Sequence, residues 1–236
     1  MDSWLGDLFL SITSASTSLE IFSELKKCAY ELEFDYCAYG LRYPIPFTKP
    51  RIITINNYPP AWRERYEKLG YANIDPTVLH AQQSQSPFAW SELPLDDARP
   101  FWEEAKTYGL AVGWAKSTLD ASGGGGMLSL ARSSEDLSAK ELKAKELRMR
   151  LLADFAHMAL SNVHREEMAT SAAKLSIREV EILRWHADGK TANDIGRILS
   201  ISIDTVKFHT KNAVVKLGAS NKTAAVARAA IMGLLV

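Results

Sequence analysis

Residues 175–218 have the sequence LSIREVEILRWHADGKTANDIGRILSISIDTVKFHTKNAVVKLG, which contains the signals for three short helices. Ser176 and Glu179 have the spacing of a capping box, so a helix is expected to begin there. Gly189 is expected to end this helix, because glycine readily adopts the left-handed conformation that follows a helix. One face of the helix is expected to be apolar through Val180, Leu183 and Ala187.

The rest of this stretch predicts two further helices joined by a turn. Thr191 is expected to cap a short amphipathic helix whose apolar stripe is Ile195, Ile198 and Leu199. After the turn, Ser202 is expected to cap a helix over about residues 203–217, which ends at Gly218. This succession of caps and turns is typical of a helix-turn-helix module.

The third predicted helix has one basic, polar face. Lys207 and Lys211 are four residues apart and share a side, with Thr205 and Asn212 also exposed. Such a helix fits the DNA major groove, where these side chains can contact base edges and phosphates. The alternative is a small helical bundle whose lysines are simply solvated.

Charge is distributed unevenly along the 236-residue chain. The whole sequence has 28 basic and 28 acidic residues and is 47% hydrophobic, which is ample for a packed core. Residues 174–236 contain 10 basic and 5 acidic side chains, so the preceding part is acidic by difference. This asymmetry favours a nucleic-acid partner for the C-terminal part only.

Nothing in the sequence predicts a metal site, export or a membrane span. Cys28 and Cys37 are the two cysteines, and their spacing does not match a metal cluster. No apolar run reaches about 18 residues, and the N-terminus lacks the basic head of a signal peptide. A cytoplasmic protein with reduced thiols and no membrane partner is expected.

The N-terminal part is predicted to be an α+β domain, with an antiparallel sheet sandwiched between helical layers. Two helices are expected before residue 33, and a long charged helix from about residue 138 to 163. The tetraglycine of residues 123–126 is expected to be a flexible hairpin tip, since no GK[ST] follows it.

The expected domains are residues 1–163 and 175–236, joined by a flexible polar link over residues 164–174. Between the opening helices and the long helix, strands are expected at 34–41, 51–55, 110–118 and 127–132, with helices near Pro59, near Pro76 and at 101–108.

Aromatic residues are concentrated between residues 56 and 80. Tyr58, Trp62 and Tyr66 recur every four residues, which predicts one face of a helix, and Asp75 follows directly before a proline. An aromatic stripe is more often part of a core than of a ligand site. Here, however, a carboxylate follows rings that bear O–H and N–H groups, and such groups need partners when buried.

The segment GKTANDIGRILSISIDTVKFHTKNAVVKLGASNKTAAVARAA resembles the C-terminal DNA-binding domain of LuxR-type transcriptional regulators. Asp194 departs conservatively from the Glu that many members carry. By matching positions, the resemblance implies a surface that contacts double-stranded promoter DNA. Its expected members are Lys190, Thr191, Thr205, Lys207, His209, Lys211, Asn212 and Lys222, of which Lys190 and Lys222 are expected near phosphates.

The N-terminal part is similar to the autoinducer-binding domain of LuxR-type acyl-homoserine-lactone receptors, through NYPPAWRERY, YANIDPTV, Trp90, FWEEA, YGLAVG and MLSLAR. By position, the resemblance implies that Trp62 donates to the lactone carbonyl and Asp75 accepts from the amide N–H. Tyr58 and Ser129 would donate to the acyl carbonyl. These three donors and one acceptor complement the polar groups of such a ligand.

The acyl tail is expected among apolar and aromatic residues. The candidates by position are Gly40, Tyr66, Val78, Trp90, Phe101, Ala105 and Leu110. Ser117 stands where relatives often have Pro, and Ala115 is small, so the sequence leaves the length and 3-oxo substitution of the tail open.

The resemblance implies a quorum-sensing regulator that needs no cofactor and acts as a homodimer. It would bind an N-acyl-homoserine lactone, recognise an inverted-repeat promoter element and activate transcription with RNA polymerase. Two alternatives remain. An orphan receptor could repress, or could act as an anti-activator through heterodimers. An enzyme could act on the lactone through His80 and Ser129, but no GxSxG or metal-cluster motif supports catalytic residues.

Overall fold

The computed structural model describes residues 2–43, 50–93, 98–120, 124–169 and 175–235. The chain forms two compact units, the first extending to Val163 and the second continuing from His164.

The N-terminal unit is built on an antiparallel sheet in the strand order β2-β1-β5-β4-β3. The expected antiparallel sheet is therefore confirmed. The short strand β3 is not expected from the sequence. The strands are β1 (Tyr36–Tyr43), β2 (Arg51–Asn56), β3 (Phe88–Ala89), β4 (Val112–Leu119) and β5 (Gly125–Arg132).

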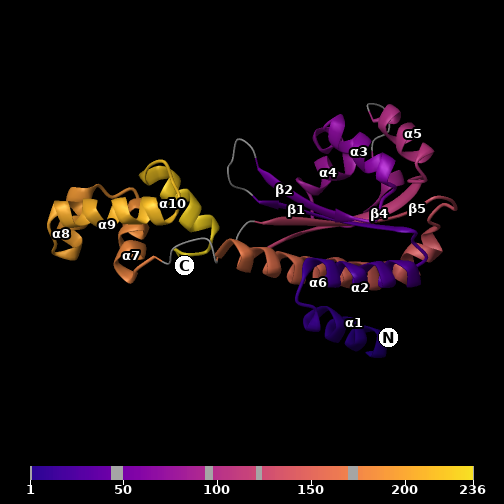
Figure 1. The fold of residues 1–236 in the computed structure, drawn as a ribbon, viewed down its shortest axis with the longest axis horizontal. Coiled ribbons are helices and arrows are strands. Elements are labelled where there is room, and N and C mark those ends of the chain that lie inside the picture. Colours follow the sequence, from indigo (N-terminus) through magenta and orange to yellow (C-terminus); the bar gives the residue numbers. More distant parts are fainter. Residues whose placement is uncertain (1, 44–49, 94–97, 121–123, 170–174, 236) are drawn as a thin grey trace. The chain divides into compact units, whose positions relative to one another are not determined.

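Helices cover both faces of this sheet, as expected for the sandwich (Figure 1). Helices α2 and α6 lie on one face with α1 beyond them, and α3, α4 and α5 lie on the other. The helices are α1 (Asp2–Ser14), α2 (Ser18–Glu31), α3 (Pro60–Lys68), α4 (Pro76–Ala81), α5 (Arg99–Thr107) and α6 (Ala139–Ala169), with 3-10 turns η1 (Tyr71–Asn73) and η2 (Trp90–Glu92).

Alternation along the strands divides the interior into two cores. Cys37, Tyr39 and Leu41 of β1 pack toward α2 and α6 in the larger core. Because side chains alternate between the faces of a sheet, Ala38 and Gly40 point to the opposite face, toward α3 and α5. The second, aromatic core lies on that face.

Three details of the N-terminal unit differ from the sequence prediction. Gly125 and Gly126 belong to β5 rather than to a hairpin tip, and Gly126 is needed there because a Cβ would lie 2.3 Å from Nδ1 of His157. Helix α6 continues to Ala169, so residues 164–169 are helical and not a flexible link. Two parts of these predictions lie outside the described residues. They are residues 170–174 of the predicted link and the first glycine of the tetraglycine. Tyr58 precedes α3, whose first residue is Pro60.

The C-terminal unit consists of α7 (Ile177–Ala187), α8 (Ala192–Leu199), α9 (Ile203–Lys216) and α10 (Lys222–Ile231). All three predicted caps are confirmed. Ser176 with Glu179 and Thr191 with Asp194 each form a complete capping box, and the Ser202 side chain accepts from the backbone N–H of Thr205. The inner face is partly different from the prediction. Ala187 and Ile198 are exposed, whereas the predicted Leu183 and Ile195 are buried, and Ile182 is buried although the sequence did not single it out.

Candidate functional site

An aromatic cluster lies between the sheet and helices α3 and α5. Trp62 of α3 is at its centre and is only 2% exposed. Its ring centroid lies 5.7 Å from that of Phe101 and 5.4 Å from that of Tyr108. The other large buried members are Tyr71, Phe88, Trp90, Leu93, Trp102 and Leu110.

Asp75 lies buried at the edge of this cluster, as the N-cap of α4. Its Oδ1 accepts from the backbone N–H and the hydroxyl of Thr77, at 2.8 and 2.7 Å. Its Oδ2 accepts from the hydroxyl of Tyr66 at 2.9 Å. A carboxylate oxygen can accept two hydrogen bonds, so Oδ2 has capacity for one more donor.

Burial raises the pKa of Asp75, and the hydrogen bonds from Thr77 and Tyr66 oppose that shift. The same environment raises the pKa of Tyr66, first through burial and then through the nearby Asp75 charge. Tyr66 therefore remains a hydroxyl donor at neutral pH. The arrangement is a buried acceptor held in one orientation by three donors.

Tyr58 and Ser129 form the second polar group of the site. Burial raises the pKa of the Tyr58 hydroxyl, and the Ser129 side chain opposes this shift. Ser129 is 3% exposed, and its Oγ has no well-formed hydrogen bond to any described residue. Apart from this weak interaction with Tyr58, the buried Ser129 hydroxyl forms no hydrogen bond of normal geometry, which is unfavourable and indicates a place for a bound acceptor.

Small side chains lie beside Ser129 on the sheet. In the register of the sheet, Ser129 is opposite Ala38 on one side and Ala115 on the other. On the same face, a Cβ at Gly113 would lie 2.3 Å from the ring of Trp90, so the indole rests directly on the backbone of β4. The sheet therefore presents a row of short side chains beneath a rim of large rings.

The structure brings most of the expected tail residues together. Tyr66, Trp90, Phe101, Ala105 and Leu110 all belong to the aromatic cluster. Gly40 is on the same face of the sheet, opposite Met127. Val78 is a half-buried residue of α4 and is not a member of the cluster.

Several residues that the sequence did not single out also hold this site. Thr77 supplies two of the three donors to Asp75, and its position directly after Asp-Pro is a usable local signal. Glu104 of α5 binds both Arg65 of α3, at 2.6 Å, and the hydroxyl of Tyr71. No local pattern predicts the Glu104 contacts, because they join residues more than 30 positions apart.

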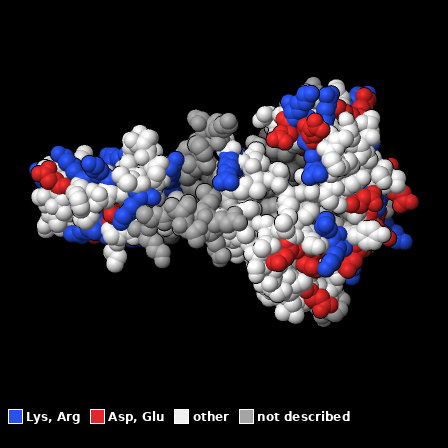
Figure 2. Space-filling view, viewed as in Figure 1, with Lys and Arg blue, Asp and Glu red and all other residues white. Residues whose placement is uncertain are grey.

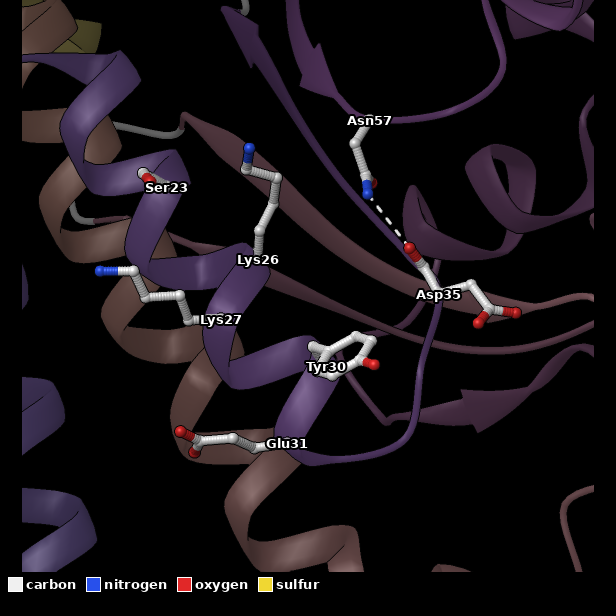
Figure 3. Close-up of a pocket in the computed structure, with 7 residues that line it drawn as sticks. All are labelled: Ser23, Lys26, Lys27, Tyr30, Glu31, Asp35 and Asn57. Carbon is white, nitrogen blue, oxygen red and sulfur yellow. Dashed lines mark hydrogen bonds between the residues drawn. The ribbon is translucent and has the colours of Figure 1, made fainter.

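A surface hollow on the outer side of α2 is separate from this site. Figure 3 shows its lining residues, which are Ser23, Lys26, Lys27, Tyr30, Glu31, Asp35 and Asn57. Asn57 donates to the backbone oxygen of Asp35 at 3.1 Å. None of the expected ligand-binding residues lines this hollow, so we assign it no role.

The exposed side of α9 forms the candidate DNA-contacting face. Lys207 and Lys211 are exposed on it, whereas Thr205, His209 and Asn212 are half-buried along its margin. The Thr205 hydroxyl lies 2.8 Å from that of the cap residue Ser202. Phe208, which the sequence pattern does not single out, is 60% exposed on the same side as the two lysines.

The remaining expected DNA-contacting residues lie at helix starts. Lys190 and Thr191 are exposed before α8, and Lys222 is exposed at the first residue of α10. The Thr191 hydroxyl donates to the Asp194 carboxylate at 2.6 Å, in addition to the two bonds of the capping box. On the face shown in Figure 2, the C-terminal unit carries mostly basic groups, whereas the N-terminal unit carries both signs.

Comparison with known proteins identifies both units. Residues 17–160 match the autoinducer binding domain, and residues 173–229 match the bacterial regulatory proteins of the luxR family. The chain belongs to the LuxR family. The transcriptional activator AnoR of Acinetobacter nosocomialis is 41% identical over the full length of both chains. The quorum-sensing regulator RhlR of Pseudomonas aeruginosa is 38% identical, over 98% of this chain and 96% of RhlR.

Solved structures agree with this family assignment over both units. A crystal structure of Escherichia coli SdiA has a TM-score of 0.88 at 36% identity, covering 99% of this chain and 98% of SdiA. SdiA in complex with octanoyl-rac-glycerol has a TM-score of 0.86 at the same identity, covering 99% of this chain and 96% of that one. The relatives are named as regulators, and this LuxR-family protein is a transcriptional regulator rather than an enzyme.

Within the described residues, no group of three or more His, Cys, Asp and Glu side chains could hold a metal ion. Helix α6 is the longest described helix, and neither it nor any other described helix is apolar enough to span a bilayer.

Proposed function

We propose that the N-terminal unit binds an N-acyl-homoserine lactone between the aromatic cluster and the sheet. The proposal rests on the presence of two buried groups. One is a carboxylate that can accept one more hydrogen bond, and the other is a hydroxyl that forms no hydrogen bond of normal geometry. Asp75 supplies the first and Ser129 the second. An amide ligand offers one N–H donor and a carbonyl acceptor, which complements the two groups.

The rest of the ligand fits the residues around these anchors. Trp62 would donate to the lactone carbonyl, and Tyr58 would join Ser129 at the acyl carbonyl. The apolar tail would lie along the small side chains of the sheet, among Tyr66, Trp90, Phe101, Ala105 and Leu110. Gly40 would contribute backbone only, and Val78 would lie at the edge of the site. A few polar anchors on an apolar wall are typical of small-molecule sites.

A monoacylglycerol is the second candidate ligand, since the SdiA relative was solved with octanoyl-rac-glycerol. It offers the same acyl carbonyl to Tyr58 and Ser129. It lacks an amide N–H, so a glycerol hydroxyl would have to donate to Asp75. The two ligands therefore differ in their dependence on the acceptor at Asp75.

The C-terminal unit is proposed to bind an inverted-repeat promoter element as part of a homodimer, with α9 in the major groove. Lys207 and Lys211 would face the groove, with Thr205, His209 and Asn212 beside them. The helix starts that carry Lys190, Thr191 and Lys222 would face phosphates, because unpaired backbone N–H groups at a helix start attract anions. The long helix α6 and the final helix α10 are the proposed dimer contacts.

Ligand and DNA binding would be linked through folding. A ligand that binds only the folded chain stabilises it by about 2.7 kcal/mol at a hundredfold excess over its dissociation constant. The cytoplasmic chain would then accumulate in its DNA-binding form only when the signal is present. We propose that this form activates transcription with RNA polymerase.

Mass spectrometry of molecules extracted from purified protein tests the ligand. The full chain would be expressed with a panel of acyl-homoserine lactones and, separately, with monoacylglycerols. Retention of one lactone in equimolar amount supports the proposal, and retention of monoacylglycerol alone contradicts it. A promoter reporter tests the direction of regulation, because an activator raises expression when the ligand is added, whereas a repressor or an anti-activator lowers it.

A further inference from the structure

His186 connects the turn before α8 to the middle of α9. Its Nδ1 lies 3.0 Å from the backbone oxygen of Lys190, and its Nε2 lies 3.2 Å from Oγ1 of Thr210. His186 itself is in the last turn of α7. One side chain therefore joins three elements of the helix-turn-helix module.

The chemistry of these partners fixes the protonation of the ring. A carbonyl oxygen only accepts, so Nδ1 of His186 must carry a proton and donate to Lys190. The Thr210 hydroxyl has one proton and two acceptors in reach, the Val206 oxygen at 2.8 Å and Nε2 of His186. The neutral ring can accept from Thr210, and the protonated ring can donate to it. The neutral ring forms this bond when the Thr210 proton points to Nε2 instead of to the Val206 oxygen, whereas the protonated ring donates to Thr210 while the bond to Val206 is kept.

Lys190 is held at both ends of its backbone. Its N–H donates to the oxygen of Trp185 at 2.9 Å, which with the left-handed Gly189 completes the C-terminal turn of α7. Its carbonyl accepts from His186. The turn is therefore attached to α9 through a side chain, although the Lys190 side chain itself remains exposed.

We propose that His186 is a positioning residue for DNA binding, an inference that rests on the proposed promoter binding. The Lys190 side chain would contact a DNA phosphate. Lys211, which is next to Thr210 on α9, would contact the major groove. Both contacts form together only if the turn and α9 keep a fixed separation. The His186 bridge sets that separation without touching the DNA.

The test uses the full-length, ligand-saturated protein and a duplex that it selects from a random-sequence library. His186→Asn retains a donor near the Lys190 carbonyl but does not reach Thr210. Thr210→Val removes the hydroxyl while keeping its shape. Each is expected to weaken duplex binding by about tenfold, and the double variant by no more than the single ones, because both break the same connection.

The decisive measurement is the effect of Lys190→Ala in two backgrounds. In the otherwise unchanged chain it should weaken binding and make the salt dependence shallower, by about 0.9 in log–log slope for each phosphate that is no longer neutralised. In the His186→Asn background it should have little further effect. Ser176→Ala is the matched control, since it destabilises α7 through its cap and should leave the Lys190 effect intact.

The outcomes separate this inference from the function on which it rests. Equal losses from Lys190→Ala in both backgrounds would overturn the positioning role alone. A loss of the Lys190 effect in the Ser176→Ala control would also overturn it, because general destabilisation would then be the cause. A chain that binds no duplex would overturn promoter binding and the inference together.

Discussion

The hydroxyl of Tyr66 donates to Oδ2 of Asp75 at 2.9 Å and leaves that oxygen able to accept once more. Asp75 is buried, so its orientation depends on this bond and on the two bonds from Thr77. The remaining acceptor position is where the ligand amide is expected.

Asp75→Asn should weaken ligand binding by more than about tenfold, because an N–H group replaces one of the two oxygens and a hydrogen bond to a charged acceptor is worth about 1.5–3 kcal/mol. A dose-response curve from a promoter reporter measures the effect. Duplex binding by the ligand-saturated variant should be retained. Tyr66→Phe should have a smaller effect, since it loosens the carboxylate without removing it. A variant Asp75→Asn with an unchanged dose response would contradict the head-group assignment.

Trp62→Phe should lower sensitivity to the lactone by about 1–3 kcal/mol, since it keeps an aromatic ring but removes the indole donor. Isothermal titration or the reporter midpoint gives this number. Trp4→Phe is the matched control, because the Trp4 indole donates to Glu31 on an exposed part of the N-terminal unit. If both substitutions shift the midpoint equally, the Trp62 donor is not part of the ligand site.

Gly113→Ala should displace Trp90, because the new Cβ would lie 2.3 Å from the indole ring. Overpacking of this kind destabilises a protein by about 1–3 kcal/mol. Ligand affinity should fall as well, since Trp90 lies over the row of small side chains on the sheet. Gly6→Ala is the control, as a Cβ at Gly6 meets nothing within 4 Å. Thermal unfolding with and without ligand would show both effects.

Lys211→Ala should abolish binding to the promoter duplex, because this lysine is on the exposed face of α9. The amount of soluble protein obtained with ligand should be unchanged, because the side chain is not part of the core. Lys68→Ala, an exposed lysine of the N-terminal unit, serves as the control. Fluorescence anisotropy with the selected duplex measures binding. Normal affinity of the Lys211 variant would mean that another side of α9 faces the groove.

Glu141→Gln should destabilise the N-terminal unit more at pH 7 than at pH 4. Hydrogen bonds from Arg132, and then from Lys145, lower the pKa of Glu141 to about 2. A lowered pKa in the folded state stabilises the protein above the ordinary glutamate pKa, and this stabilisation disappears as the pH falls toward 2. The loss at pH 7 should be about 1–3 kcal/mol by urea unfolding.

Glu146→Gln is the matched control for the Glu141 prediction. Glu146 is on the same helix and pairs with Arg150, but both side chains are 43% exposed. Exposed pairs contribute little, so this substitution should change stability by less than about 1 kcal/mol at either pH. A similar loss from both variants would show that burial of the Glu141 contact with Arg132 does not matter.

Short-range signals are reliable where the stabilising contacts are themselves local. The capping boxes at Ser176 and Thr191 join residues three positions apart, and both form as predicted. Periodicity places Tyr58 on the helix of Trp62, but Pro59 and Pro60 delay the start of α3. The polar composition after residue 163 suggests a link, but α6 continues as a helix to Ala169.

The sequence was sufficient for the order of helices and strands apart from β3, for the two kinds of domain and for the basic face of α9. These follow from periodicity, caps and charge, which depend on neighbouring residues. Tertiary contacts were needed for the other features. The acceptor of Asp75 and the unpaired hydroxyl of Ser129 are 54 positions apart, and Thr210 meets His186 only when α9 packs on α7. Packing alone selects such partners, because local propensity carries no information about which distant side chain completes a hydrogen bond.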